Sequence, residues 1–102
     1  MQTQQITGGL AVTAIWEARE GEADTVADIL ARFAPQARQE PGTKMFLVHR
    51  AVTNLAQFLF YELFEDEAAF EAHQQTPHFK ALIVGEGVPR LSKRERTQYR
   101  ML

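Results

Sequence analysis

The pattern of apolar and polar positions predicts two strands that are buried on both sides. Residues 9–19 read as a strand in which Val12, Ile15 and Trp16 place apolar side chains on both parities, as in a strand covered on two faces. The most apolar stretch is 57–64, which carries Phe58, Phe60, Glu62 and Phe64 on one parity and Leu59, Tyr61 and Leu63 on the other. We therefore expect both strands at the centre of one sheet.

A helix is predicted between these strands. It begins after Gly21, where Glu22 and Asp24 place negative charge near the unpaired N–H groups of a first turn. Its apolar stripe has spacings of four, three and four residues: Val26, Leu30, Phe33 and Ala37. Pro41-Gly42 ends it. Pro35 cannot donate to the carbonyl group of Ala31, so we expect it to bend the helix or to split off the last turn.

The rest of the chain supplies one more helical region and two more strands. Residues 43–52 alternate as a strand and lead through Thr53-Asn54 into a hairpin. Asp66 is the expected N-cap of a helix over 67–73, and Thr76-Pro77 supplies the N-cap and first position of a second short helix that ends before Gly85. Residues 85–89 are expected to form a loop.

The polar segment 91–99 is typical of an edge strand or of a strand used between subunits. The resulting order, βαββαβ, predicts an α+β fold of ferredoxin-like type, with an antiparallel sheet and helices on one face. The other sheet face needs a cover. We therefore expect a homodimer in which two sheets form a dimeric α+β barrel.

Length and composition restrict the possible classes of protein. The 102 residues form a single domain, 1–102, in which we expect residues 1–8 to be a flexible N-terminal segment. A net charge of -2 gives no electrostatic reason to expect binding to nucleic acid or to an anionic membrane. No apolar run is long enough to span a bilayer, and the polar start does not resemble a secretion signal. A cytoplasmic location is the default expectation.

Two histidines are the first candidates for chemistry. His73 shares a helical face with Ala69 and Phe70 and should point toward the sheet, where an imidazole can act as an acid, a base or a hydrogen-bond partner. The structural alternative is a buried histidine that is simply hydrogen-bonded. His78 lies in a first helical turn, where the helix dipole favours the neutral ring. Its alternative is a surface histidine beside a turn.

Glu62 is the third candidate because its neighbours on the same parity, Phe60 and Phe64, are apolar. An unpaired carboxyl group there would have a raised pKa. Its structural alternative is an ion pair with Arg50 or with a partner on the first strand. Its functional alternative is to orient or charge a histidine. No metal is expected, because Thr76-Pro77 separates the two histidines and no third ligand lies at a recognisable spacing.

Most aromatic residues are expected to belong to the core, but a planar substrate also needs aromatic walls, for which the candidates are Trp16, Tyr61, Phe64 and Phe79. No organic cofactor is expected, since the chain has no Gly-rich phosphate loop, nucleophile elbow or dinucleotide fingerprint. The basic cluster of the last strand is interpreted as a solvated edge or an inter-subunit surface: Arg90, Lys93, Arg94, Arg96 and Arg100.

The run from Phe60 to His73, followed by Thr76-Pro-His-Phe79 and preceded by Glu40-Pro-Gly-Thr43, resembles antibiotic biosynthesis monooxygenase domains. The resemblance extends from Leu10 to Tyr99. It implies the dimeric barrel fold, shared by cofactor-free oxygenases, haem-degrading enzymes and an isomerase. The haem-degrading pattern is not matched, because the first strand has no asparagine, His73 replaces a tryptophan and Ile83 stands near the expected histidine ligand.

The resemblance implies a cofactor-independent monooxygenase that acts on a small quinol-like or polyphenolic substrate with dioxygen. His73 and His78 would handle protons, with Glu62 in support. Two alternatives stay open: an isomerase or related proton-transfer enzyme acting on a small hydroxy-ketone, and a non-catalytic, ligand-binding dimeric barrel.

Overall fold

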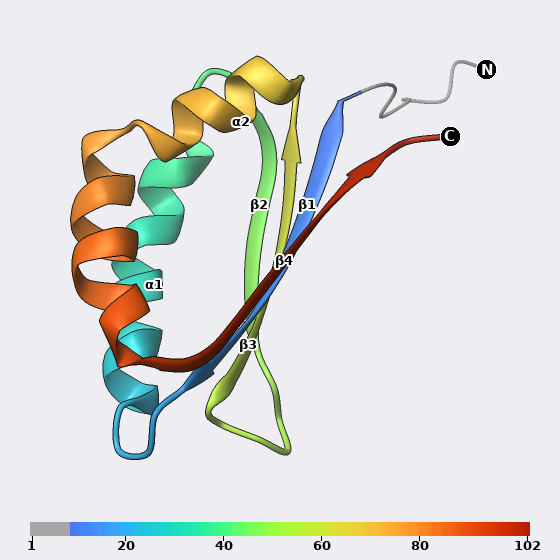
Figure 1. The fold of residues 1–102 in the computed structure, drawn as a ribbon. Coiled ribbons are helices and arrows are strands. Elements are labelled where there is room, and N and C mark those ends of the chain that lie inside the picture. The colour runs from blue at the N-terminus through green and yellow to red at the C-terminus, as the bar shows by residue number, and fades with distance from the viewer. Residues whose placement is uncertain (1–8) are drawn as a thin grey trace.

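The fold is a four-stranded antiparallel sheet with all helices on one face (Figure 1). The computed structural model describes residues 9–102, so the flexible segment expected at 1–8 lies outside the described residues. The elements follow in the order β1 (Leu10–Ala18), α1 (Ala23–Arg38), β2 (Thr43–Arg50), β3 (Gln57–Phe64), α2 (Glu67–Gln74), the π-helical segment η1 (Phe79–Gly87), the 3₁₀ turn η2 (Val88–Arg90) and β4 (Leu91–Arg100). The predicted ferredoxin-like α+β fold is confirmed.

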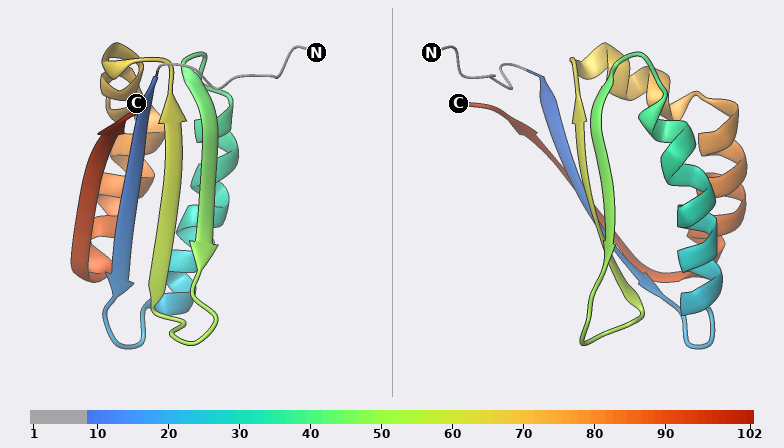
Figure 2. Two further views of the ribbon diagram at one scale, coloured as in Figure 1. Left: turned by 90° about the vertical axis from the view of Figure 1, so that its right-hand side faces the viewer. Right: turned by 180° about the vertical axis from the view of Figure 1, so that it is seen from behind.

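The strands lie in the order β2-β3-β1-β4, and every neighbouring pair is antiparallel (Figure 2). The two strands with apolar residues on both parities, β1 and β3, are central, as predicted. Glu62 of β3 lies opposite Val12 of β1 and Phe46 of β2. This register places the candidate carboxyl group in the middle of the sheet.

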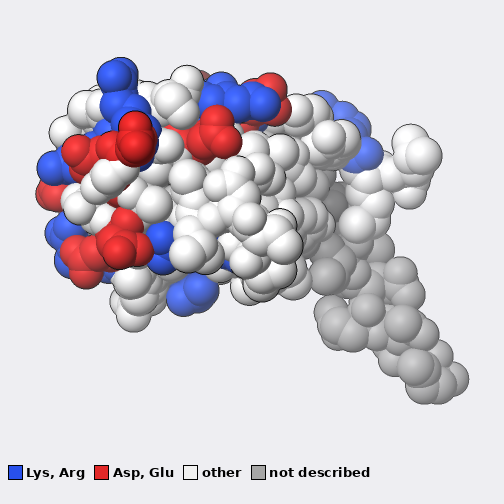
Figure 3. All heavy atoms as spheres, turned by 90° about the horizontal axis from the view of Figure 1, so that it is seen from below, with Lys and Arg blue, Asp and Glu red and all other residues white. Residues whose placement is uncertain are grey.

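Side chains alternate between the two sheet faces, as the pleat requires. On the helix side, the strands bury Leu10, Val12, Ala14, Trp16, Phe46, Phe58, Phe60 and Phe64. The opposite face is open in the single chain and exposes large hydrophobic side chains, among them Leu47, Leu59, Tyr61 and Tyr99. In Figure 3, charged side chains gather over the helix side, whereas the surface toward the open sheet face is largely uncharged.

Helix α1 runs without interruption from Ala23 to Arg38, so Pro35 does not split off the last turn, and the expected bend of the helix stays a prediction. The helix buries Phe33, Ala34 and Ala37 on both sides of the proline. Tertiary packing of this kind outweighs the local loss of one backbone hydrogen bond. The predicted apolar stripe is confirmed.

Two boundaries differ from the sequence prediction. The strand expected at 43–52 is β2, which ends at Arg50, and the Ala51 N–H group then donates to the Gln57 carbonyl group to close the hairpin. The loop expected at 85–89 is helical, and the Val88 N–H group donates to Ile83, five residues earlier. Position 87 favours glycine because a Cβ atom there would lie 3.0 Å from two ring atoms of Trp16. Gly87, the last residue of η1, thus permits close packing, and the chain continues directly into the turn η2.

None of the helices within residues 9–102 combines the length and the apolar composition that crossing a bilayer requires.

Candidate active site

His73 lies at the centre of the helix side, at the end of α2. Asp66 fixes the start of this helix, because its carboxylate accepts a hydrogen bond from the Ala69 N–H group at 2.8 Å. One turn later, Phe70 and His73 turn inward together, and His73 is 2 % exposed. Five phenylalanine rings surround its imidazole, with centroids between 5.1 and 6.4 Å away: Phe33, Phe46, Phe64, Phe70 and Phe79.

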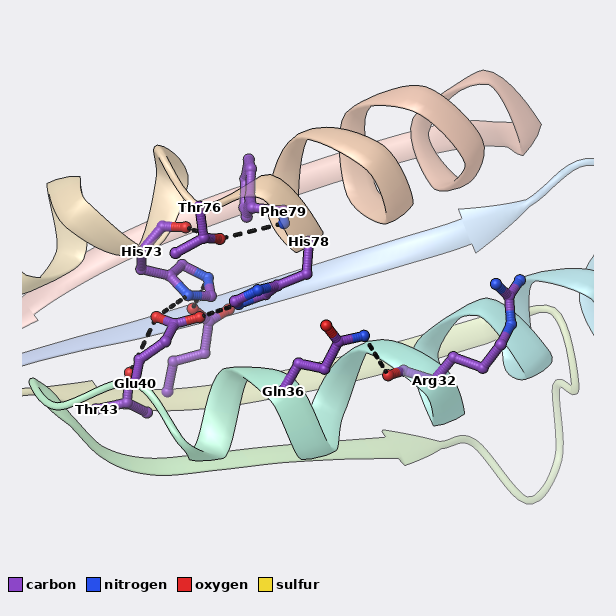
Figure 4. A network of polar contacts seen from close by, with 9 residues as sticks. Arg32, Gln36, Glu40, Thr43, His73, Thr76, His78 and Phe79 are labelled. Carbon is purple, nitrogen blue, oxygen red and sulfur yellow. Dashed lines mark hydrogen bonds and ion pairs between the residues drawn. The ribbon is translucent and has the colours of Figure 1, made fainter.

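A single carboxylate joins both candidate histidines (Figure 4). One oxygen of Glu40 lies 2.8 Å from Nδ1 of His73, and the other lies 2.6 Å from Nε2 of His78. A carboxylate only accepts hydrogen bonds, so both ring nitrogens donate to it. Charge-assisted hydrogen bonds of this length are among the stronger polar contacts in proteins.

Glu40 follows the end of α1, in the turn Glu40-Pro-Gly-Thr43. The Thr43 hydroxyl group donates to Oε1 of Glu40 at 3.4 Å, and the Glu65 N–H group donates to the Gly42 carbonyl group at 2.9 Å. A Cβ atom on Gly42 would lie 2.4 Å from Cβ of Ala69 in α2. The glycine therefore lets this turn pack against α2, the helix that carries His73.

His78 begins the second helical region, as predicted. The Thr76 hydroxyl group accepts a hydrogen bond from the Phe79 N–H group at 3.2 Å, which is the expected N-cap contact. The side chain of His78 is 18 % exposed, against 2 % for His73 and 11 % for Glu40. The polar chain therefore runs from near the surface at His78, through Glu40, to the buried ring of His73.

Glu62 faces His73 from the sheet. Its Oε1 atom lies 3.9 Å from Nε2 of His73, and the residue is 6 % exposed. Burial raises the pKa of the Glu62 carboxyl group to about 8, an effect that Arg96 and Arg94 oppose and Glu40 reinforces. The suggested ion pair with Arg50 is wrong. That guanidinium reaches out to Asp24 at 2.8 Å instead, because its strand position lies at the far end of β2.

The side chains of His73 and Glu62, which face each other, differ in protonation at neutral pH. Burial lowers the pKa of His73, although the Glu40 carboxylate opposes this shift. Since Nδ1 of His73 donates to Glu40, the neutral ring presents an unprotonated Nε2 atom toward Glu62. Glu62 with its raised pKa keeps its proton. In these protonation states the His73 ring can accept a proton and the Glu62 carboxyl group can donate one.

These groups line a cavity of about 30 Å³. Its walls are aromatic: Trp16, Phe33, Phe46, Phe60, Phe70 and Phe79. Trp16 and Phe60 pack with their centroids 4.9 Å apart. Roughly 10–15 Å³ suffices for one water molecule, and a cavity of about 150 Å³ has been shown to bind benzene. In this conformation the cavity holds small molecules only, and an aromatic ring requires it to widen.

Most of the predicted site residues come together here. Glu62, His73, Trp16 and Phe79 line the cavity, His78 joins through Glu40, and Phe64 packs behind the His73 ring.

Tyr61 does not join them, because it lies on the open sheet face, 37 % exposed. Neighbouring residues of a strand point to opposite faces. Tyr61 and Glu62 therefore cannot line the same cavity from one chain.

Three residues that line or organise the site were not among the predicted ones. Glu40 was visible only as part of the turn motif, although an acidic residue beyond a helix C-terminus, where cations are favoured, was a usable signal. Arg94 and Arg96 were attributed to a solvated edge or an inter-subunit surface. In the structure they line the cavity, since they lie opposite Trp16 and Ala14 of β1 and share their face. Two-residue spacing alone shows that they share a face but does not show which one.

The described residues, 9–102, contain no group of three or more histidine, aspartate or glutamate side chains arranged to hold a metal ion.

The ferredoxin-like sheet and the buried cluster of Glu40, Glu62 and His73 describe a small α+β protein with ionisable groups between its sheet and its helices. Residues 10–84 match the model of the antibiotic biosynthesis monooxygenase family. The chain belongs to this family.

Solved structures share the fold over nearly the whole chain. The protein PA3566 of Pseudomonas aeruginosa superimposes with a TM-score of 0.85 at 26% identity, covering 97% of this chain and 99% of its own. A conserved protein of Methanosarcina mazei superimposes with a TM-score of 0.86 at 18% identity, covering 94% of this chain and 95% of its own. A structure described as an antibiotic biosynthesis monooxygenase superimposes with a TM-score of 0.80 at 24% identity, covering 90% of this chain and 95% of its own. No curated protein sequence matches this one.

Proposed function

We propose that this protein is a cofactor-independent monooxygenase that oxidises a small quinol or polyphenol with dioxygen. The observation that carries the proposal is the hydrogen bond from His73 Nδ1 to Glu40, which leaves Nε2 of a buried imidazole facing an aromatic cavity. Family membership supports an oxidoreductase. The aromatic walls suit a planar ring, and their low polarity keeps water away from reactive intermediates.

In the proposed reaction, Nε2 of His73 takes the proton of a phenolic hydroxyl group, and the Glu40 carboxylate stabilises the resulting imidazolium. The electron-rich phenolate gives one electron to dioxygen, and the two radicals combine to form a C–O bond at a ring carbon. The imidazolium protonates the peroxide, and Nε2 of His73 then takes the proton from that carbon while the O–O bond breaks and a carbonyl group forms. The released hydroxide takes a proton from Glu62 and leaves as water, and the imidazolium returns a proton to Glu62 across 3.9 Å. The balance is quinol plus O₂ to hydroxyquinone plus H₂O.

The experiment is an oxygen-uptake assay with a panel of quinols, run beside anaerobic reactions. Wild-type protein should consume one O₂ per quinol oxidised. His73→Gln should reduce the rate by about 10²- to 10⁴-fold, the usual contribution of one acid–base group. His49→Gln is the matched control, because this third histidine is exposed and lies on the other sheet face.

Two results would point elsewhere. Turnover of a quinol or a hydroxy-ketone without oxygen consumption, but with deuterium incorporated from D₂O, would identify a proton-transfer enzyme such as an isomerase. The acid–base pair at 3.9 Å is the observation that keeps this second reaction in view. Binding without any turnover, unchanged by His73→Gln, would indicate a ligand-binding protein.

A further inference from the structure

The two arginines of the cavity come from one strand. Arg94 and Arg96 are separated by one residue on β4, so both side chains lie on the helix side, next to Trp16 and Ala14 of β1. The residue between them, Glu95, points to the opposite face. Because β4 is the edge strand of the sheet, no further strand of residues 9–102 lies beside it.

Arg94 and Arg96 differ from the other arginines of residues 9–102 because neither makes a hydrogen bond or an ion pair. The rest all donate to a backbone carbonyl or a carboxylate: Arg19, Arg32, Arg38, Arg50, Arg90 and Arg100. The specific contact of Arg96 is with an aromatic ring, because its guanidinium lies 5.2 Å from the centroid of Phe70. The fold has thus placed two unpaired sets of hydrogen-bond donors at its site.

These arginines also form the mouth of the cavity. The other residues that line it are all buried, none more than 9 % exposed, whereas Arg94 and Arg96 are exposed. Long side chains that no hydrogen bond holds can move at little cost. The widening that an aromatic ring requires can therefore take place at Arg94 and Arg96 without disturbing the core.

The local charge is unbalanced in favour of an anion. Partial burial, and then the like charge of Arg96, lower the pKa of Arg94, while Glu62 opposes this. The carboxyl group of Glu62 interacts electrostatically with both arginines, but burial keeps it protonated at neutral pH, so it does not neutralise their charge. The Glu40 carboxylate is already shared by two histidines. Two cationic groups thus stand at the mouth without a counter-anion from residues 9–102.

We infer that the substrate of this site carries a carboxylate, which Arg94 and Arg96 bind at the mouth while the phenolic ring enters the cavity toward His73. The part about the phenolic ring rests on the proposed function. A guanidinium group matches the two oxygens of a carboxylate in a planar fork, and a negative ligand relieves the repulsion between the two arginines. A neutral quinol would leave both guanidinium groups unpaired.

The test compares two probes that differ only in charge, 2,5-dihydroxybenzoate and 2,5-dihydroxybenzamide, by calorimetric titration without oxygen. The carboxylate should bind about 10- to 100-fold more tightly, the range expected for hydrogen bonds to a charged group. Added salt should weaken the binding of 2,5-dihydroxybenzoate more than the binding of 2,5-dihydroxybenzamide. In the double variant Arg94→Gln/Arg96→Gln the difference in affinity between the two probes should disappear.

The matched control is Lys93→Gln, which removes one positive charge from the same strand but on the open face, where Lys93 pairs with Glu95 at 3.6 Å. It should keep the preference for the carboxylate. Equal affinity of the two probes for the wild type, or a preference that survives the double variant, would overturn the inference.

Binding and oxidation can fail independently. If 2,5-dihydroxybenzoate binds through the arginines but consumes no oxygen, the inference about the carboxylate stands and the monooxygenase proposal loses support. If quinols that carry a carboxylate and quinols that do not are oxidised with equal kcat/KM, the monooxygenase proposal stands and the inference about the carboxylate is overturned.

Discussion

Nδ1 of His73 lies 2.8 Å from the carboxylate of Glu40, a residue 33 positions earlier in the chain. This contact gives the imidazole its orientation and its tautomer. It also connects the turn after α1 to the end of α2.

Replacing Glu40 with glutamine removes the charge but keeps the size of the side chain. The imidazolium formed during turnover would lose its counter-charge, so we expect kcat to fall by about 10²- to 10⁴-fold with little change in KM. Steady-state kinetics on any substrate that the oxygen-uptake panel identifies provide the measurement. Glu71→Gln, an exposed position on α2, is the control and should behave as the wild type. An unchanged kcat in Glu40→Gln would rule out the proposed role.

Glu62 should make the protein less stable as the pH rises. Its carboxyl group titrates near pH 8 when folded and near its ordinary 4.5 when unfolded. Between these values the folded state binds more protons, so the free energy of unfolding falls with increasing pH. Glu62→Gln, which mimics the protonated acid, should match the wild type below pH 4.5 and exceed it by on the order of 3–5 kcal/mol at pH 9.

Urea unfolding of both proteins from pH 4 to 9 measures this difference. The comparison cancels the opposite effect of His73, whose lowered pKa reduces stability as the pH falls below 6.5. The other charged groups near Glu62 are Arg94, Arg96 and Glu40, all retained in the variant. Parallel stability curves for the two proteins would show that Glu62 is ionised in the folded state at neutral pH.

Pro35→Ala should give a folded and slightly more stable protein. Alanine restores the N–H group that can donate to the Ala31 carbonyl group, and proline in a helix interior is less favourable than alanine by about 3 kcal/mol. Because α1 is already continuous through Pro35, we expect a gain of only about 1 kcal/mol. Thermal unfolding beside the exposed control Gln36→Ala measures it. Loss of folding would mean that the core requires the proline.

The open sheet face should pack against a second copy of the chain. A stable interface buries about 1,600 Å² in total, and this face offers Leu47, Leu59, Tyr61 and Tyr99 as exposed apolar groups. Light scattering of the wild type should give twice 11.6 kDa. A folded monomer would contradict the dimeric barrel.

The structure now distinguishes two neighbouring substitutions on β3. Leu59 is 44 % exposed on the open face, whereas Phe60 is 3 % exposed in the core. Leu59→Lys should therefore yield a folded monomer, and Phe60→Lys should unfold the chain, as a buried unpaired charge does. Leu55→Lys, in the exposed β2–β3 hairpin, is the control and should leave the dimer intact.

The parts of the fold that could be predicted from the sequence depend on local periodicity. The stripe of α1, the central place of β1 and β3 and the N-cap at Thr76 each follow from spacing within a few residues. The helical character of 85–89 did not follow, because Gly87 is required by the distant ring of Trp16 and not by its own segment. A glycine that ends a helix and one that permits packing look the same in sequence.

The same distinction applies to the site. The inward orientation of His73 and Glu62 follows from their apolar neighbours, Phe70 and Phe60. The hydrogen bonds of Glu40 with His73 and His78 could not be predicted, because these partners lie 33 and 38 residues away and only the packed fold brings them together. Arg94 and Arg96 could be placed on a common face, but only the register with β1 shows that it is the inner one.

The match to the family model covers residues 10–84 and stops before β4 begins at Leu91. Glu40, Glu62, His73 and His78 all lie within the shared part, whereas the two arginines of the mouth lie outside it. The residues proposed to handle protons and those proposed to bind a carboxylate thus lie in separate segments of the chain. Because β4 is an edge strand, residues 94 and 96 can be substituted without loss of the core, so the ligand preference of this chain can change while Glu40, Glu62 and the two histidines stay the same.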